Sequence, residues 1–139
     1  ICTPPIGMGI ATLLAPKKYN TEEREAGKAA ILMGSVGITE GAIPFAANDP
    51  LRVIPSIMVG AVVGNIIPFM MGVLNHAPWG GLIVLPVVEG WPGYILGIVA
   101  GSLVTALMVN FLKKENNDIT EYDKEIKIEE DFDIEFTEL

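Results

Sequence analysis

A single acidic side chain, Glu40, lies in an otherwise uncharged part of the sequence. The segment around it reads Gly-Ile-Thr-Glu-Gly-Ala-Ile-Pro-Phe, residues 37–45, and the long apolar runs nearby indicate a membrane. A carboxylate within a membrane costs roughly 2.5–3.5 kcal/mol on insertion scales. Such an acid is retained where a polar substrate, an ion or a buried donor meets it. Glu40 is therefore a candidate binding residue.

The neighbours of Glu40 suit the recognition of a hydroxyl-rich molecule. Thr39 adds a hydroxyl, while Gly37 and Gly41 allow close approach of the backbone. A carboxylate can accept hydrogen bonds from two sugar hydroxyls, and charge-assisted bonds of this kind are strong. The alternatives are that Glu40 pairs with Arg52 or caps a helix. Acids within membrane segments are functional by default, which favours binding.

Five other polar residues have simpler explanations. Asp49 and Arg52 are three residues apart and can pair at a helix end. Asn65, inside an apolar run, is expected to form an interhelical hydrogen bond. His76, the only histidine, is expected in a loop at the membrane interface, and Glu89 in a solvated loop.

Two tryptophans and one cysteine complete the set of candidates. Trp91 is expected to anchor the interface, and Trp79, beside a glycine pair, can do the same or stack on a sugar ring. Cys2 is the only cysteine, which excludes an internal disulfide and a multi-cysteine metal site. No catalytic triad, phosphate-binding loop or metal-ligand cluster occurs in the sequence. We expect no catalytic residue, no metal and no cofactor.

The elements that carry these residues are long and apolar. Half of the 139 residues are hydrophobic, and residues 53–74 and 94–112 contain no charge. Each run can cross a hydrocarbon layer of about 30 Å as a helix. We therefore expect an all-α, polytopic integral membrane protein with two full spans, 53–75 and 94–112. The run 82–88 is too short to cross alone.

Charge divides the chain into a body and a tail. Residues 1–114 carry a net charge of +1 and residues 115–139 carry −9, which together give the total of −8. The acidic tail alternates acids with Ile and Phe, a composition that favours disorder or docking to a partner. Nothing in this distribution suggests nucleic-acid binding.

The segment before the spans is predicted to fold back on itself. Residues 15–28 form a polar connection in which Asn20 or Thr21 can cap a helix, and residues 29–38 follow as a short apolar helix. Basic residues in 17–28 and at 113–114 mark both regions as cytoplasmic, so an even number of crossings separates them. The two spans supply that number. Segment 29–48 is then a re-entrant hairpin with Glu40 near its tip, unless 82–88 contributes to a third crossing.

The beginning of the chain indicates a fragment. It opens within an apolar run that lacks the charged region and cleavage site of a signal peptide. We expect residues 1–14 to be the end of a membrane segment interrupted by Pro4, Pro5 and Gly7. The sequence is expected to be the C-terminal piece of a longer membrane protein.

The segment Gly-Ile-Thr-Glu-Gly-Ala-Ile-Pro-Phe-Ala-Ala, residues 37–47, resembles the membrane-embedded IIC component of bacterial sugar phosphotransferase systems, of the fructose family. Residues 4–8, 22–30, 49–55 and 77–81 resemble the C-terminal third of the same family. The resemblance covers about residues 4–114, so residues 1–114 are identified as the C-terminal part of a IIC domain.

The resemblance implies a permease of the bacterial inner membrane that binds a sugar and presents it to the phosphorylated IIB component. The glutamate of the family's Gly-Ile-Thr-Glu motif, which contacts sugar hydroxyls, corresponds to Glu40. The phosphocysteine belongs to IIB, so no phosphorylated residue is expected in this chain. Permeases of this kind resemble homodimers in contact with membrane lipid, and the tail 115–139 would be cytoplasmic.

One residue departs from the family pattern. Fructose-type members typically show histidine where this chain has Trp79, which opens a mannosylglycerate-type substrate as an alternative to fructose. The predicted sugar-binding residues are Glu40, Thr39, Gly37, Gly41 and Trp79. Two other functions stay open from the sequence: an ion-coupled secondary transporter with Glu40 as proton carrier, and a membrane interaction module that binds through its acidic tail.

Overall fold

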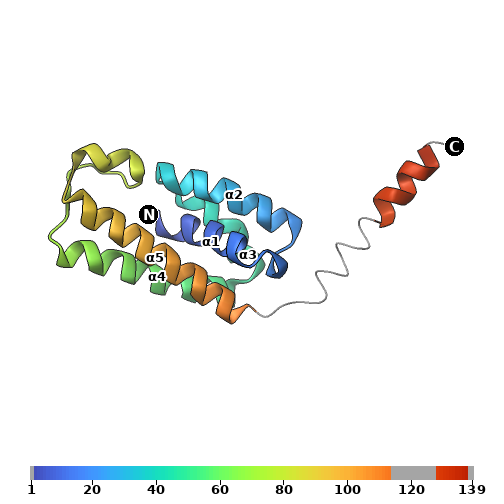
Figure 1. The fold of residues 1–139 in the computed structure, drawn as a ribbon, viewed down its shortest axis with the longest axis horizontal. Helices are drawn as coiled ribbons and strands as arrows, with labels where there is room; N and C mark the ends of the chain where they lie inside the picture. Colours follow the sequence, from blue (N-terminus) through green and yellow to red (C-terminus); the bar gives the residue numbers. More distant parts are fainter. Residues whose placement is uncertain (1, 114–127, 138–139) are drawn as a thin grey trace.

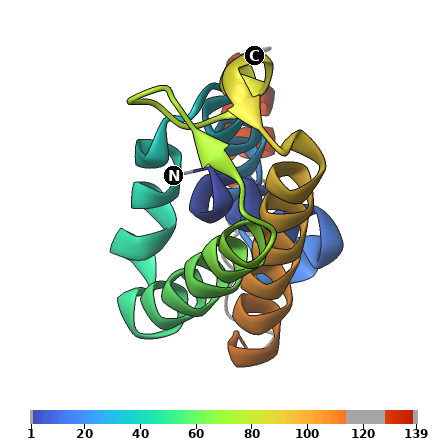
Figure 2. The ribbon, with the colours of Figure 1, turned by 90° about the vertical axis from the view of Figure 1, so that its left-hand side faces the viewer.

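The computed structural model describes residues 2–113 and 128–137, and the first of these ranges forms a helical bundle (Figure 1). Helix α1 (Thr3–Leu14) packs against α2 (Thr21–Val36) and α5 (Trp91–Leu112). Helix α4 (Pro50–Met70) lies along α5. Figure 2 shows α1 surrounded by the other helices. The bundle therefore has α1 as its central element.

The two longest helices have the length and composition of membrane spans. Helices α4 and α5 contain 21 and 22 residues, or about 32 and 33 Å at 1.5 Å per residue. Their predicted counterparts, 53–75 and 94–112, begin three residues too late. Only 22% of the apolar window of α4 and 39% of that of α5 are buried within the chain. Apolar helices this exposed need lipid or further protein around them.

Glycines bring α4 and α5 into close contact. A Cβ added at Gly101 would lie 2.6 Å from the Gly60 carbonyl oxygen and 2.8 Å from Gly64 Cα. Neither backbone atom can move aside. Small residues that let two helix backbones approach in this way are typical of packing between membrane helices.

Helix α2 begins where the sequence predicted a cap. The Asn20 side chain accepts a hydrogen bond of 2.7 Å from the Glu23 backbone, and Glu23 accepts one of 3.2 Å from the Asn20 backbone. This reciprocal pair is a capping box. The expected boundary near residue 29 was wrong, because α2 runs unbroken from Thr21 to Val36. Residues 22–28 are polar but favour helix, so the change in polarity marks no break.

Helix α1 is also continuous, which corrects the expected interruption. Pro4 and Pro5 lie in its first turn, where backbone N–H groups have no partner within the helix and proline is tolerated. Gly7 allows contact with α5, since a Cβ there would lie 2.6 Å from Thr105 Cβ. These residues therefore shape the start and the packing of one helix.

The loop between α4 and α5 contains the strands of the described chain. Strands β1 (Leu74–Asn75) and β2 (Val88–Glu89) pair antiparallel, a feature that the all-α expectation lacked. Between them, Leu82–Val87 forms a 3-10 helix, η3. Six residues at about 2.0 Å each span only about 12 Å. On its own, this segment is too short to cross a membrane.

A buried ion pair joins three helix ends. Lys113 Nζ, after α5, lies 3.2 Å from the Glu23 carboxylate of α2, and both side chains are 8% exposed. Asn48, just before α4, lies 3.5 Å from the same carboxylate. The start of α2, the start of α4 and the end of α5 therefore meet at one end of the bundle, which holds both basic regions predicted to share one side of the membrane.

Part of the acidic tail is helical. Residues 128–137 form a helix whose side chains are all exposed, with the Phe132 and Phe136 rings 5.3 Å apart. The rest of the tail, residues 115–127 and 138–139, lies outside the described residues. The expected disorder of the tail stays a prediction there.

Candidate functional site

The Glu40 turn joins the end of α2 to a short helix that runs back toward the start of α2. Helix α2 ends in Gly37, whose φ of 93° is left-handed, and the Ile38 N–H donates a 2.8 Å hydrogen bond to the Met33 carbonyl. The 3-10 turn η2 (Thr39–Ala42) and helix α3 (Ile43–Asn48) follow. Glycine adopts this left-handed conformation at little cost. A left-handed residue here ends α2 with a defined geometry.

Gly41 fits the turn against α2. A Cβ added there would lie 3.0 Å from Ala30 Cα and 3.3 Å from the Ala30 and Met33 Cβ atoms. Gly41 and Ala42 are buried, while Thr39 and Glu40 are exposed on the opposite side of the turn. The packing of one side of η2 therefore presents the two polar side chains outward.

The Glu40 carboxylate has neither of the partners offered as alternatives to binding. Arg52 Nη1 lies 3.2 Å from Asp49 Oδ2, the pair predicted from their spacing. Among residues 2–113, no side chain caps η2 or α3, the two elements next to Glu40. Within the described part of the chain, no hydrogen bond or ion pair engages the Glu40 side chain. The carboxylate is free to accept hydrogen bonds from a ligand.

Trp79 reaches the end of α2 from a distant loop. Its indole Nε1–H donates a 3.1 Å hydrogen bond to the Val36 carbonyl, 43 residues away in sequence. A Cβ added at Gly37 would lie 2.9 Å from that nitrogen, and one at Gly81 would lie 2.8 Å from the Val36 carbonyl carbon. The structure thus brings Gly37 and Trp79 together at the turn that continues into Thr39 and Glu40.

Two side chains hold the Trp79 loop in place. Asn75 Nδ2 donates to the Trp79 carbonyl at 2.9 Å, and its Oδ1 accepts from the Ala77 N–H at 2.9 Å. The Tyr94 hydroxyl donates to the Gly81 carbonyl at 3.0 Å and accepts from the Gly81 N–H at 3.1 Å. The loop carrying Trp79 is therefore fixed from both β1 and α5.

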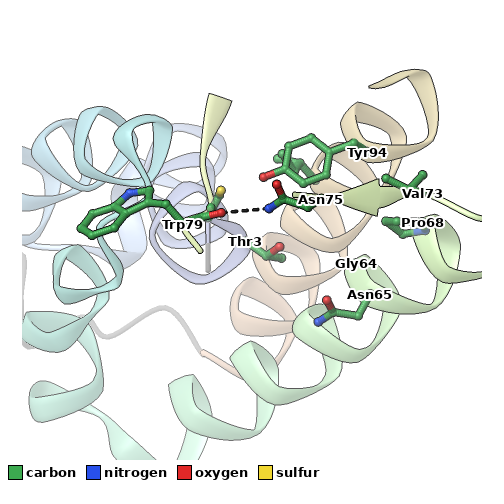
Figure 3. Close-up of a pocket in the computed structure, with 11 residues that line it drawn as sticks. Thr3, Gly64, Asn65, Pro68, Val73, Asn75, Trp79 and Tyr94 are labelled. Carbon is green, nitrogen blue, oxygen red and sulfur yellow. Dashed lines mark hydrogen bonds between the residues drawn. The ribbon is translucent and has the colours of Figure 1, made fainter. Parts of the chain in front are cut away.

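A cavity of about 270 Å³ opens beside this loop (Figure 3). It lies between the start of α1, the last two turns of α4, the loop and the first turns of α5. Its polar side chains include Thr3, Asn65, Asn75 and Tyr94, and Trp79 forms part of its wall. Of the predicted site residues, Trp79 is the only one that lines it. Sequence reasoning missed this cavity.

The observed contact of Asn65 differs from the predicted one. As an amide in an apolar span, Asn65 was also the sequence feature that could have pointed to the cavity. Its Nδ2 donates a 2.7 Å hydrogen bond to the Ala61 carbonyl of its own helix, so the expected interhelical bond is not formed. An amide in the middle of an apolar span needs a polar surrounding. The cavity supplies one. Thr3, at the start of α1, gave no comparable signal.

The remaining candidates are two exposed loop residues, one exposed tryptophan and one buried cysteine. His76 Nε2 lies 3.3 Å from Glu89 Oε1, and both side chains are mostly exposed. Trp91 begins α5 and is also exposed, so its role as an interfacial anchor stays a prediction. Cys2 is buried and unpaired. In residues 2–113 and 128–137, no group of three or more His, Cys, Asp or Glu side chains could hold a metal ion.

Known proteins show strong sequence similarity to this chain. It is 57% identical over 137 residues to fructose-like permease IIC component 2 of Escherichia coli (strain K12), which covers 96% of the chain. It is 50% identical over 115 residues to the PTS system fructose-specific EIIB'BC component of Rhodobacter capsulatus, covering 81%. The chain belongs to the fructose family of IIC components. The PTS system fructose-specific EIIC component of Haloferax volcanii is 43% identical over 110 residues, or 79% of the chain.

The family assignment concerns part of a longer protein. The chain spans 38% of the length of the Escherichia coli relative and 20% of the Rhodobacter capsulatus relative. No protein-family model and no solved structure matches the chain.

Proposed function

We propose that this chain forms part of a phosphotransferase-system permease that binds a fructose-type sugar within the membrane. The observation that carries the proposal is the Glu40 carboxylate, which is exposed in a turn without a partner among the described residues. Relatives named fructose-specific or fructose-like support the same reading. The chain thus serves uptake as a binding and presenting unit.

Glu40 is the principal sugar ligand in this proposal. Its carboxylate accepts hydrogen bonds from two sugar hydroxyls, and the exposed Thr39 hydroxyl adds a third polar contact. Trp79, which is 56% exposed, offers its ring face to the C–H side of a sugar ring. Gly37 and Gly41 support the site by allowing the turn to pack closely.

The phosphoryl group comes from a partner. Relatives named EIIB'BC combine a IIB and a IIC component in one chain, which supports a IIB component as that partner. The permease presents the bound sugar to phosphorylated IIB, and this chain is a membrane subunit of the transferase without a phosphoryl carrier of its own. It spans the bacterial inner membrane several times, contacts lipid, forms a homodimer and keeps its acidic tail in the cytoplasm.

The hairpin formed by α2, η2 and α3 is re-entrant in this proposal. It leaves and returns at the end of the bundle that carries Glu23 and Lys113, which supports the charge-based orientation. Broken backbone within a membrane is tolerated where it lines a polar cavity or is buried in protein. The Glu40 turn then lies at membrane depth on the sugar path.

The sugar is of the fructose type, and Trp79 adjusts the preference within that class. An indole donates one hydrogen bond and accepts none, whereas the imidazole expected from the family can do both. Trp79 uses its donor on Val36. It therefore offers a sugar only its ring face.

The test is sugar uptake by cells that carry the full-length permease with Glu40→Gln. Loss of a charge-assisted hydrogen bond predicts a reduction of about 10- to 100-fold in phosphoenolpyruvate-dependent uptake of labelled fructose. The matched control is Glu25→Gln, an exposed acid of α2 away from the turn, which should match wild type. Uptake of unmodified sugar that an uncoupler abolishes, or normal uptake by Glu40→Gln, would contradict the proposal.

A further inference from the structure

The cavity beside the Trp79 loop is lined without formal charge. Among the residues that the structure describes, its lining includes no Asp, Glu, Lys, Arg or His side chain. The polar groups are hydroxyls and carboxamides, and Pro68, Val73 and Ile98 add apolar surface. A phosphate ester carries a charge of about −1.5 to −2 at neutral pH and is costly to desolvate without a cation. The lining therefore suits a neutral polyhydroxyl molecule.

Two of the polar side chains in the cavity are already committed to the protein. Asn75 uses both ends of its carboxamide on the loop, and the Tyr94 hydroxyl both donates to and accepts from Gly81. These groups fix the wall of the cavity. Their hydrogen-bonding capacity is largely used before a ligand arrives.

Two other polar side chains keep free capacity. The Thr3 hydroxyl makes no hydrogen bond to any residue in the described ranges, although the residue is only 8% exposed. Asn65 donates one N–H to Ala61, which leaves its carbonyl oxygen and its second N–H without a described partner. Figure 3 shows the two side chains on adjacent helices facing the same cavity. Each can donate to and accept from a sugar hydroxyl.

We propose that this cavity binds the unphosphorylated sugar through Thr3 and Asn65 and rejects the sugar phosphate. The inference rests on the proposed function. It adds Thr3 and Asn65 as a second group of sugar-binding side chains beside the Glu40 group. The 79–81 segment contacts both the cavity and the end of α2, so one loop separates the two groups. The absence of a cation from the lining gives the site its preference for substrate over product.

The first test measures equilibrium binding of labelled fructose to the full-length permease in detergent. Thr3→Val and Asn65→Leu each remove a neutral hydrogen bond with little change in size, and each should raise Kd about 3- to 10-fold. Thr3→Ser keeps the hydroxyl and should bind as wild type does. Thr12→Val is the matched control on α1, because Thr12 bonds to Gly9 within its own helix and lies outside the cavity lining.

The second test adds fructose 1-phosphate at 100-fold excess over fructose. Wild-type protein should retain its bound fructose, whereas displacement at the same affinity as unlabelled fructose would overturn the inference. Two outcomes separate this inference from the proposed function. If wild type binds fructose and Glu40→Gln weakens binding, but Thr3→Val and Asn65→Leu bind normally, the cavity assignment alone is wrong. If wild type binds no fructose, both are wrong.

Discussion

Gly37 meets two separate requirements at the residue scale. Its φ of 93° lies in the left-handed region, and the Trp79–Gly80 loop packs directly against its Cα. The first requirement ends α2, and the second allows the distant loop to reach the turn that carries Glu40. Gly37 was predicted to allow close approach of the backbone to a ligand. In the structure, the segment that approaches it closely is the Trp79–Gly80 loop.

Replacement of Gly37 by alanine should separate these two requirements when compared with Gly72→Ala. Gly72 has a similar φ of 67°, but an added Cβ there meets nothing within 4 Å. Both changes carry the left-handed penalty of about 1–2 kcal/mol. Only Gly37→Ala also collides with the Gly80 carbonyl. We expect a clearly lower Tm for Gly37→Ala in detergent and weaker fructose binding.

Equal Tm values for the two alanine variants would contradict the close approach. Normal fructose binding by a folded Gly37→Ala protein would show that the contact between the loop and α2 does not matter to the sugar. Gly72 lies in the loop after α4 and belongs to neither group of proposed ligands, which makes it a suitable reference.

At the scale of elements, the ion pair between Glu23 and Lys113 joins α2 to the end of α5. The Lys113 ammonium also lies 4.1 Å from the centre of the Tyr19 ring. Burial, with the charges of Glu23 and Asp49 nearby, raises the pKa of the Tyr19 phenol above its ordinary value. The ring therefore stays neutral beneath the cation. This cluster holds the start of α2 to the end of α5.

Removal of both members of the pair should destabilise the protein by less than the sum of the two single removals. Glu23→Gln or Lys113→Met leaves a buried charge without its partner, which typically costs about 3–5 kcal/mol. The double variant leaves neither charge, so its loss should be smaller than the sum of the single losses. Denaturant unfolding of the four proteins in detergent measures this coupling. Additive losses would show that the pair contributes no direct interaction.

The start of α2 was predictable from the sequence, but several boundaries and the short strands were not. Asn20 gave a local signal for the start of α2, and that start was confirmed. The change from polar to apolar residues near 29 was mistaken for the start of a separate helix, because polarity and helix propensity differ. Strands of two residues, such as Leu74–Asn75, depend on pairing with distant partners. Local sequence carries little information about that pairing.

At the scale of the whole molecule, large apolar side chains cover the outside of the two spans. Leu51, Phe69 and Phe111 are each more than 85% exposed. Surface of this kind needs an apolar neighbour, which is lipid or the remainder of the permease. The basic regions meet at one end of the bundle, and the Trp79 loop lies at the other end of the two spans. This polarity fits a chain that crosses the membrane.

The sidedness can be measured with single cysteines in a full-length permease whose native cysteines, Cys2 included, are replaced by alanine. Lys17→Cys lies in the predicted cytoplasmic connection, and His76→Cys lies in the loop between the spans; both positions are exposed. A membrane-impermeant maleimide should label His76→Cys in intact cells and Lys17→Cys only after permeabilisation. Labelling of both positions from outside would contradict the even number of crossings.

The site shows where sequence reasoning stops. Glu40 and Trp79 were predicted as site residues from their residue types and their glycine-rich surroundings, and their binding role stays a prediction. The contact between the Trp79 loop and α2 spans 43 residues, and the cavity draws side chains from α1, α4, the loop and α5. Such assembly depends on tertiary packing, which a single sequence does not specify residue by residue. Thr3 could be placed in the site only by the fold.

The indole of Trp79 has a consequence for how the contact between its loop and α2 responds to acidity. An imidazole in its place would gain a proton between about pH 5 and 8, and its bonds to the end of α2 would change with the medium. The indole N–H does not titrate in that range, so the bond to Val36 is the same in acidic and in neutral surroundings.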